Sequence, residues 1–129
     1  MWEDVAALEQ MLGHPWDGIV IAANDIGCHW PRRLDHWCSL HPEKLKKWAE
    51  LRAQNGHPDG YLTWARRLPR LVDRVVSNFD GGASGMLAVR VAQALGCTHV
   101  VLCGVPMDRS GHFAESTEHQ PGRAFPAAG

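Results

Sequence analysis

With 129 residues, of which 45% are hydrophobic and 21% charged, the chain has the size and composition of one globular domain and is too short for two. A formal net charge of −1 lacks the basic surplus typical of nucleic-acid or anionic-membrane binding, and no apolar run approaches the roughly 20 residues that cross a bilayer. Four cysteines in a chain with core-forming patterns do not indicate a disulfide framework, so we expect a cytoplasmic protein without nucleic-acid or membrane partners.

The first two predicted elements are an amphipathic helix and a buried strand. Residues 3–12 repeat their apolar side chains on one helical face, and residues 19–23 form a continuous apolar run of the length of an internal parallel strand. Asn24 and Asp25 follow that strand. Open α/β sheets bind ligands at the carboxyl ends of their strands, so both residues are candidate ligand contacts. The alternative is a plain turn, because Asn and Asp are common turn formers.

Further short elements are predicted in the middle of the chain. Residues 35–40 indicate a short strand, and residues 42–54 a helix, because Pro42 suits a first helical turn and strong helix formers follow it. Residues 57–68 are polar, aromatic and bounded by prolines, which we interpret as a surface excursion. A short strand over residues 71–76 then leads into a glycine-rich turn.

That turn, Gly81-Gly82-Ala83-Ser84-Gly85, begins the most clearly patterned part of the chain. A largely buried helix is predicted over residues 84–95, with Ser84 as its N-cap and Gly96 ending it in a left-handed conformation. The apolar run Val100–Cys103 shows no alternation and predicts a parallel strand near residues 99–105. Turn, helix and strand form half of a βαβ unit, with the second strand parallel to the one near residues 18–24.

The same turn is the main candidate for ligand binding. Its glycines let the backbone approach a ligand, and its amides and the helix N-terminus favour a phosphate or carboxylate. We therefore name Gly82, Ala83, Ser84 and Gly85 as candidate ligand-binding residues. The alternative is a turn that only packs closely against the sheet. The pattern is not a P-loop, because no lysine follows the last glycine, and it lacks the full dinucleotide fingerprint.

A cluster of cysteines and histidines in the middle of the chain is a candidate metal site. Soft metal ligands gather at Cys28, His29, His36, Cys38 and His41. Their spacings do not match structural zinc pairs, so neither a metal site nor a cofactor is predicted.

His112 is the candidate catalytic residue. It follows the predicted strand of residues 99–105 and lies near Asp108 and Arg109, where a histidine can act as an acid or base near neutral pH. The alternative is an exposed loop histidine without a role. Residues 120–129 are rich in Pro, Gly and Ala, and we expect a flexible tail after a single domain over residues 1–119.

A family resemblance covers residues 18–25 and 78–107. GGASGMLAVRVAQALGCTHVVLCGVPMD looks like the turn, helix and strand of a Rossmann-like group of phage and bacterial proteins, and this group is similar to bacterial sialyltransferases that use a CMP-sugar donor. IVIAANDIG resembles the strand that precedes their nucleotide site. The resemblance implies a Rossmann-like three-layer sandwich with a mainly parallel sheet, and a nucleotide or nucleotide-sugar pocket edged by Asn24 and the Gly82–Gly85 turn.

The sequence also departs from that group. Its members typically open with a strand and a Gly/Ser-rich loop, whereas this sequence starts at the first helix, so half of their phosphate cradle has no counterpart here. His112 matches their catalytic histidine only loosely.

Three hypotheses follow. The first is a nucleotide-binding or nucleotide-sugar-binding protein related to glycosyltransferases, with doubtful turnover. The second is a non-catalytic, phage-encoded protein that sequesters a nucleotide signal or contacts a partner protein. The third is a fold without a small ligand, whose sheet edge serves homo-oligomerisation. The base, sugar and acceptor stay open.

Overall fold

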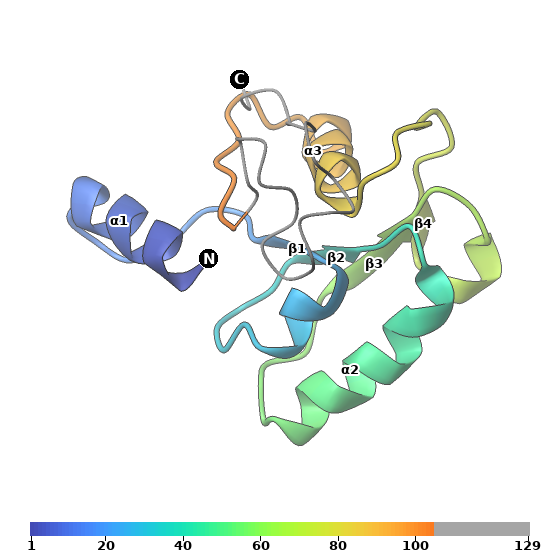
Figure 1. The fold of residues 1–129 in the computed structure, drawn as a ribbon, viewed down its shortest axis with the longest axis horizontal. Helices are drawn as coiled ribbons and strands as arrows, with labels where there is room; N and C mark the ends of the chain where they lie inside the picture. Colours follow the sequence, from blue (N-terminus) through green and yellow to red (C-terminus); the bar gives the residue numbers. More distant parts are fainter. Residues whose placement is uncertain (105–129) are drawn as a thin grey trace, which may run out of the picture. The chain divides into compact units, whose positions relative to one another are not determined.

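The computed structural model describes residues 1–104 (Figure 1). These residues divide into two compact units. The larger unit comprises residues 19–97, and the smaller one comprises residues 1–18 together with the described residues from 98 onward. No helix in the described part of the chain is long and apolar enough to cross a membrane.

The larger unit is built on a four-stranded sheet in which every strand runs parallel to its neighbours. The strands are β1 (Ile21–Ala23), β2 (His36–Cys38), β3 (Leu62–Ala65) and β4 (Arg74–Val75), and their order in the sheet is β1-β2-β3-β4. The predicted α/β class with a parallel sheet is therefore confirmed, as are the strands expected near residues 19–23, 35–40 and 71–76.

Strand β3 contradicts the prediction of a surface excursion over residues 57–68. Only four residues form this strand, too few for a periodic pattern, and turn-forming residues lie on both sides of it. What selects the extended conformation is pairing: Trp37 of β2 is in register with Thr63, and Cys38 with Trp64. Such a partner cannot be read from a local pattern.

Helices α2 (Leu45–Gln54) and α3 (Ser84–Ala94) lie on opposite sides of this sheet (Figure 1). Both were predicted, and α2 is preceded by a short 3₁₀ turn over Pro42–Lys44. Because successive side chains of a strand point to opposite faces, Cys38 faces α3 while Trp37 lies against Gly27 and the Tyr61 ring.

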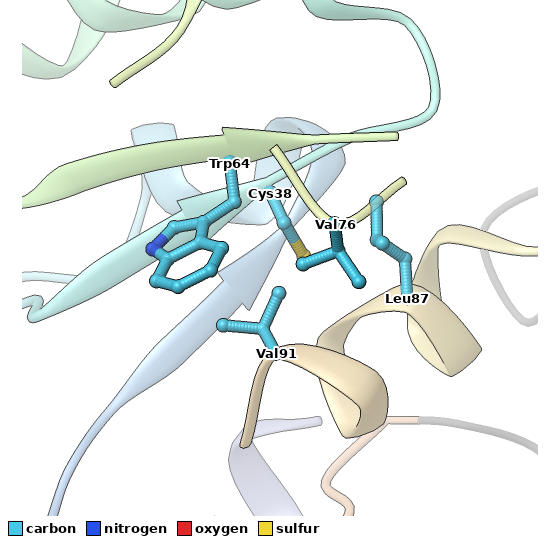
Figure 2. Packing of buried hydrophobic residues seen from close by; sticks show 5 residues of the cluster. All are labelled: Cys38, Trp64, Val76, Leu87 and Val91. Carbon is cyan, nitrogen blue, oxygen red and sulfur yellow. The ribbon is translucent and has the colours of Figure 1, made fainter. Parts of the chain in front are cut away.

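The core between the sheet and α3 is a compact cluster of buried side chains. Its five buried members are Cys38, Trp64, Val76, Leu87 and Val91 (Figure 2). Figure 2 shows Trp64 and Cys38 pointing from the strands toward Val91 on the helix. As predicted, the helix ends before Gly96, which takes a left-handed φ of 86°.

On the other side of the sheet, a buried arginine joins α2 to the loop after β1. This loop begins with the 3₁₀ helix η1 (Asn24–Cys28). The Arg52 side chain is 1% exposed. Its guanidinium donates to four backbone carbonyls, those of Gly27, Trp30, Arg32 and Pro58. A single α2 side chain therefore fixes three points of the β1–β2 connection.

The connection between β3 and β4 is unusually short for parallel strands. Such connections normally need a dozen or more residues, often including a helix. Here residues 66–73 suffice, with one 3₁₀ turn, η3 (Pro69–Leu71). Leu68 takes a left-handed φ of 63°, which is costly for a bulky side chain. We call residues 66–73 the β3–β4 loop.

The smaller unit contains the predicted N-terminal helix, α1 (Trp2–Leu12), which ends at Gly13 with a φ of 80°. Two of its carboxylates hold backbone amides: Asp4 accepts from the Gly104 N–H at 2.7 Å, and Glu9 accepts from the Trp16 N–H at 2.6 Å. None of the helix residues is buried.

The strand predicted near residues 99–105 is wrong over its described part, because residues 99–104 contain no strand. An apolar run predicts burial, but a strand also needs a hydrogen-bonded neighbour. Here the burial itself is incomplete, since Val101 is 51% exposed. Over residues 99–104, the parallel pairing expected with the strand near residues 18–24 is therefore not present. The predicted tail of residues 120–129 lies outside the described residues.

Candidate functional site

Four parallel strands bring their carboxyl ends to one edge of the sheet, and a different residue follows each strand there. Asn24 follows β1, Ser39 follows β2, Arg66 follows β3 and Val76 follows β4. Ligands of open parallel sheets bind at this edge. It is therefore the first place to look for a binding site.

Asn24 has the most constrained geometry at this edge. Its φ of 61° is left-handed, a conformation that Asn tolerates better than most residues. The Asn24 carbonyl accepts a hydrogen bond from Trp37 Nε1 at 2.6 Å, and Asn24 Oδ1 accepts one from Ser39 Oγ at 2.8 Å. Both bonds hold the residue in place at the end of β1.

Ser39 determines which way the Asn24 amide points. Its side chain is fully buried, and its Oγ accepts from the His41 N–H at 2.9 Å. The Ser39 hydroxyl donates its proton to Asn24 Oδ1, so the oxygen of the amide lies on the Ser39 side. Asn24 Nδ2, with its two protons, has no partner within residues 1–104 and can donate to a ligand.

Ser84 also contacts the residues that follow β2, but it does not act as the predicted N-cap of α3. The cap residue of α3 is Ala83, with a φ of −131°, and Ser84 is the first residue of the helix. Ser84 Oγ instead accepts from the Leu40 N–H at 3.1 Å, and the side chain is 6% exposed. The N-cap prediction is wrong because a tertiary donor has taken the hydroxyl oxygen.

These contacts bring Asn24 and Ser84 onto one short segment, Ser39-Leu40-His41. Asn24 binds its first residue and Ser84 its second. We call Asn24, Ser39 and Ser84, together with the glycine-rich turn of residues 81–85, the carboxyl-edge site. Within the turn, Gly82 is exposed, Gly85 is half-buried and Ala83 is buried. Asp25 is exposed in the first turn of η1.

Ser39, His41 and Arg66 were not predicted as site residues. Ser39 directly follows β2, as Asn24 follows β1. Because the predicted strand extended to residue 40, the sequence did not show that Ser39 lies at a strand end. Arg66 directly follows β3 and donates from Nη1 to the Gly81 carbonyl at 3.4 Å, which places a guanidinium beside the turn. The exposed His41 ring lies with Nδ1 3.7 Å from Glu43 Oε1.

Cys28 and Cys38, the two buried cysteines of the larger unit, do not have reactive thiolates. Burial raises the pKa of Cys38 to about 12, so its thiol stays protonated at neutral pH. Burial, and then the charge of Asp25, raise the pKa of Cys28. Neither thiol is an activated nucleophile. Within residues 1–104, no three His, Cys, Asp or Glu side chains converge to hold a metal ion.

What the described edge offers is therefore a set of neutral hydrogen-bond donors beside an arginine. His112, the candidate catalytic residue, lies outside the described residues. Comparison with protein-family models, curated proteins and solved structures finds no match to this chain.

Proposed function

We propose that this chain is a Rossmann-like protein, related to glycosyltransferases, that binds a nucleotide or nucleotide-sugar at the carboxyl-edge site. The observation that carries the proposal is the joining of Asn24 and Ser84 through one segment at the carboxyl ends of parallel strands. Asn24 Nδ2 faces no described partner, and the turn before α3 is rich in glycine. Such a turn at a helix N-terminus suits a phosphate group.

Helices on both faces of a parallel sheet support the Rossmann-like, three-layer assignment. The path of the chain supports it too. After β4, at one edge of the sheet, α3 returns to pack on β1 and β2. Ligands of open parallel sheets bind at the carboxyl ends of the strands, and Asn24 directly follows β1 at that edge.

Thermal unfolding in the presence of nucleotides and sugar nucleotides tests the proposal. A ligand at 100 times its Kd stabilises the folded state by about 2.7 kcal/mol, which is a measurable rise in Tm. We expect at least one member of a panel of nucleoside monophosphates, diphosphates and sugar nucleotides to give this rise. No shift with any of them would contradict nucleotide binding.

Two Asn24 variants locate the site. Asn24→Gly keeps the left-handed backbone and removes only the amide, whereas Asn24→Ala also strains the backbone. Both should weaken affinity by roughly 1–3 kcal/mol, the cost of leaving a polar ligand group without its partner. Gln54→Ala, on the exposed face of α2, is the control and should bind normally. Unchanged affinity in both Asn24 variants would place the ligand elsewhere.

Binding without turnover is the second candidate function, and the chemistry of the described edge favours it. Asn24, Ser39 and Ser84 are neutral, and the hydroxyl oxygens of both serines are already engaged in hydrogen bonds to the backbone. A protein of this kind would sequester a nucleotide or present it to a partner protein. Incubation with sugar nucleotides, followed by product analysis, separates the two functions. Hydrolysis or transfer that falls by about 10²–10⁴-fold in His112→Ala would establish catalysis.

A further inference from the structure

The β3–β4 loop, together with the first residue of β4, carries a concentration of positive charge. Residues 66–74 contain four arginines and one aspartate, although the whole chain has a net charge of −1. The loop directly follows the carboxyl end of β3, and Arg66 bonds to the Gly81 carbonyl. This cationic segment is thus attached to the glycine-rich turn of the carboxyl-edge site.

Some charged side chains of this segment contact other parts of the protein, and others do not. Arg66 contacts the turn, and the Arg74 guanidinium lies over the Trp64 ring, 5.6 Å from its centroid. Asp73 Oδ2 accepts from the Thr63 N–H at 2.8 Å and from its hydroxyl at 3.0 Å. Arg67 and Arg70 are exposed and have no partner within residues 1–104.

The loop also holds an unfavourable backbone conformation between these two arginines. Leu68 has a left-handed φ of 63°, a conformation that is costly for a residue of its kind, and Pro69 fixes the backbone after it. Leu68 is 37% exposed, so burial of its side chain does not explain the strain. Arg67 directly precedes this strained residue, and Arg70 lies two positions after it.

We propose that the β3–β4 loop binds the second phosphate of the ligand, through Arg67 and Arg70. This rests on the proposed function and narrows it, because the preferred ligand class becomes a nucleoside diphosphate or its sugar ester rather than a nucleoside monophosphate. One phosphate lies at the turn of residues 81–85. The next extends toward the loop that Arg66 fastens to that turn. Guanidinium groups match phosphate oxygens with paired hydrogen bonds, which lysine does not reproduce.

The test compares mono- and diphosphates of adenosine, cytidine, guanosine and uridine, titrated calorimetrically into the full chain. We expect the diphosphate of the preferred base to bind at least about tenfold more tightly than its monophosphate. Arg67→Gln and Arg70→Gln should each weaken diphosphate binding by about 10–100-fold, as for a hydrogen bond to a charged group. Monophosphate binding should change by less than about twofold.

Lys46→Gln and Lys47→Gln remove the same charge from the exposed face of α2 and serve as matched controls. Urea unfolding checks that the variants keep their fold, which is expected because all four side chains are exposed on the surface. A loss of diphosphate affinity in the lysine variants equal to that in the arginine variants would overturn the inference, because it would show a general charge effect.

Two other outcomes would also overturn it. Equal affinity for mono- and diphosphates, unchanged in Arg67→Gln and Arg70→Gln, would leave nucleotide binding standing and remove the loop from the site. Equal losses for both ligand classes would show that the loop holds the first phosphate instead. If no nucleotide binds the wild-type chain, the proposed function itself fails and this inference fails with it.

Discussion

Arg52 is a buried cation whose partners are carbonyl oxygens. Its guanidinium offers five N–H donors in a fixed plane, and four bonds to backbone carbonyls use most of them. Burial lowers the pKa of Arg52 from its ordinary value, but arginine remains protonated in proteins. The Tyr61 ring lies 5.9 Å from the guanidinium carbon and adds a favourable contact.

We expect Arg52→Met to destabilise the fold by about 3–5 kcal/mol, since it leaves several buried carbonyls without donors. Arg52→Lys should also lose stability, because one ammonium cannot reach the same set of oxygens. Urea unfolding measures both, and Lys47→Met on the exposed face of the same helix is the control. A loss below about 1 kcal/mol for Arg52→Met would mean that the loop after β1 is held by other contacts.

His36 is bonded in a way that only its neutral form permits. Trp64 Nε1 can only donate, so His36 Nδ1, at 2.9 Å, must be the acceptor and Nε2 carries the proton. The two rings also make an edge contact, with centroids 5.7 Å apart. Burial lowers the pKa of His36 from its ordinary value of 6.5; Asp35 opposes this shift and Arg74 adds to it.

The pH dependence follows from that direction. Because the folded-state pKa of His36 lies below the unfolded-state value, the unfolded chain binds the proton more tightly. The contribution of His36 to stability is thus present above about pH 6.5 and is lost as the pH falls from there through the folded-state pKa. We expect His36→Gln, which can accept from Trp64 without titrating, to reduce the difference in unfolding free energy between pH 7.5 and pH 5.5. If the unfolding free energy changed equally between these two pH values in the wild type and in His36→Gln, His36 would not contribute to the pH dependence.

Among the elements, α3 contributes both to the core and to the candidate site. Leu87 and Val91 are fully buried against the sheet, while Ser84 at the start of the helix holds Leu40. Helix α2 has a more exposed apolar side chain in Leu51, which is 40% exposed. A Leu→Ala substitution on each helix therefore tests whether α3 contributes more to stability than α2.

We expect Leu87→Ala to cost about 2–5 kcal/mol, the range for a large core side chain that leaves a cavity. Leu51→Ala should cost less than about 1 kcal/mol, because much of its surface is in water already. Chemical denaturation of both variants gives the two values. Similar losses would mean that the cluster in Figure 2 is not the principal core of the larger unit.

The elements that the sequence predicted are those whose own residues encode them. The helices near residues 3–12, 42–54 and 84–95 have a repeating apolar face, and the strand of residues 19–23 is a short unbroken apolar run. Strand β3 has four residues and depends on pairing with β2. The run Val100–Cys103 has the composition of a strand but contains none.

In the candidate site, too, the residues marked by a local sequence pattern could be predicted, and the contacts between distant residues could not. Asn24 follows an apolar run, and the glycines of the turn are visible in the sequence, so both could be named. The hydroxyl of Ser84 was expected to bond within its own helix, but its donor is Leu40, 44 residues away. Ser39 is buried and lies within the predicted strand, so no local pattern marked it as the residue that orients Asn24.

For the whole molecule, the division into two units separates the candidate site from the N-terminal helix. The larger unit, residues 19–97, holds the sheet, the buried cluster and every described residue of the carboxyl-edge site. Helix α1 belongs to the smaller unit. Ligand binding is therefore expected to raise the unfolding free energy of the larger unit through mass action.

The order of the strands has a consequence for how the protein is made. Every ladder joins strands that are neighbours along the chain, β1 with β2, β2 with β3 and β3 with β4. A chain emerging from the ribosome can thus pair each strand with the one synthesised before it, without waiting for distant residues. The Asn24–Ser39 bond spans 15 residues, and the Leu40–Ser84 bond spans 44. We expect the Asn24 half of the carboxyl-edge site to assemble during translation, and α3 to complete it only after Ala94 has left the exit tunnel.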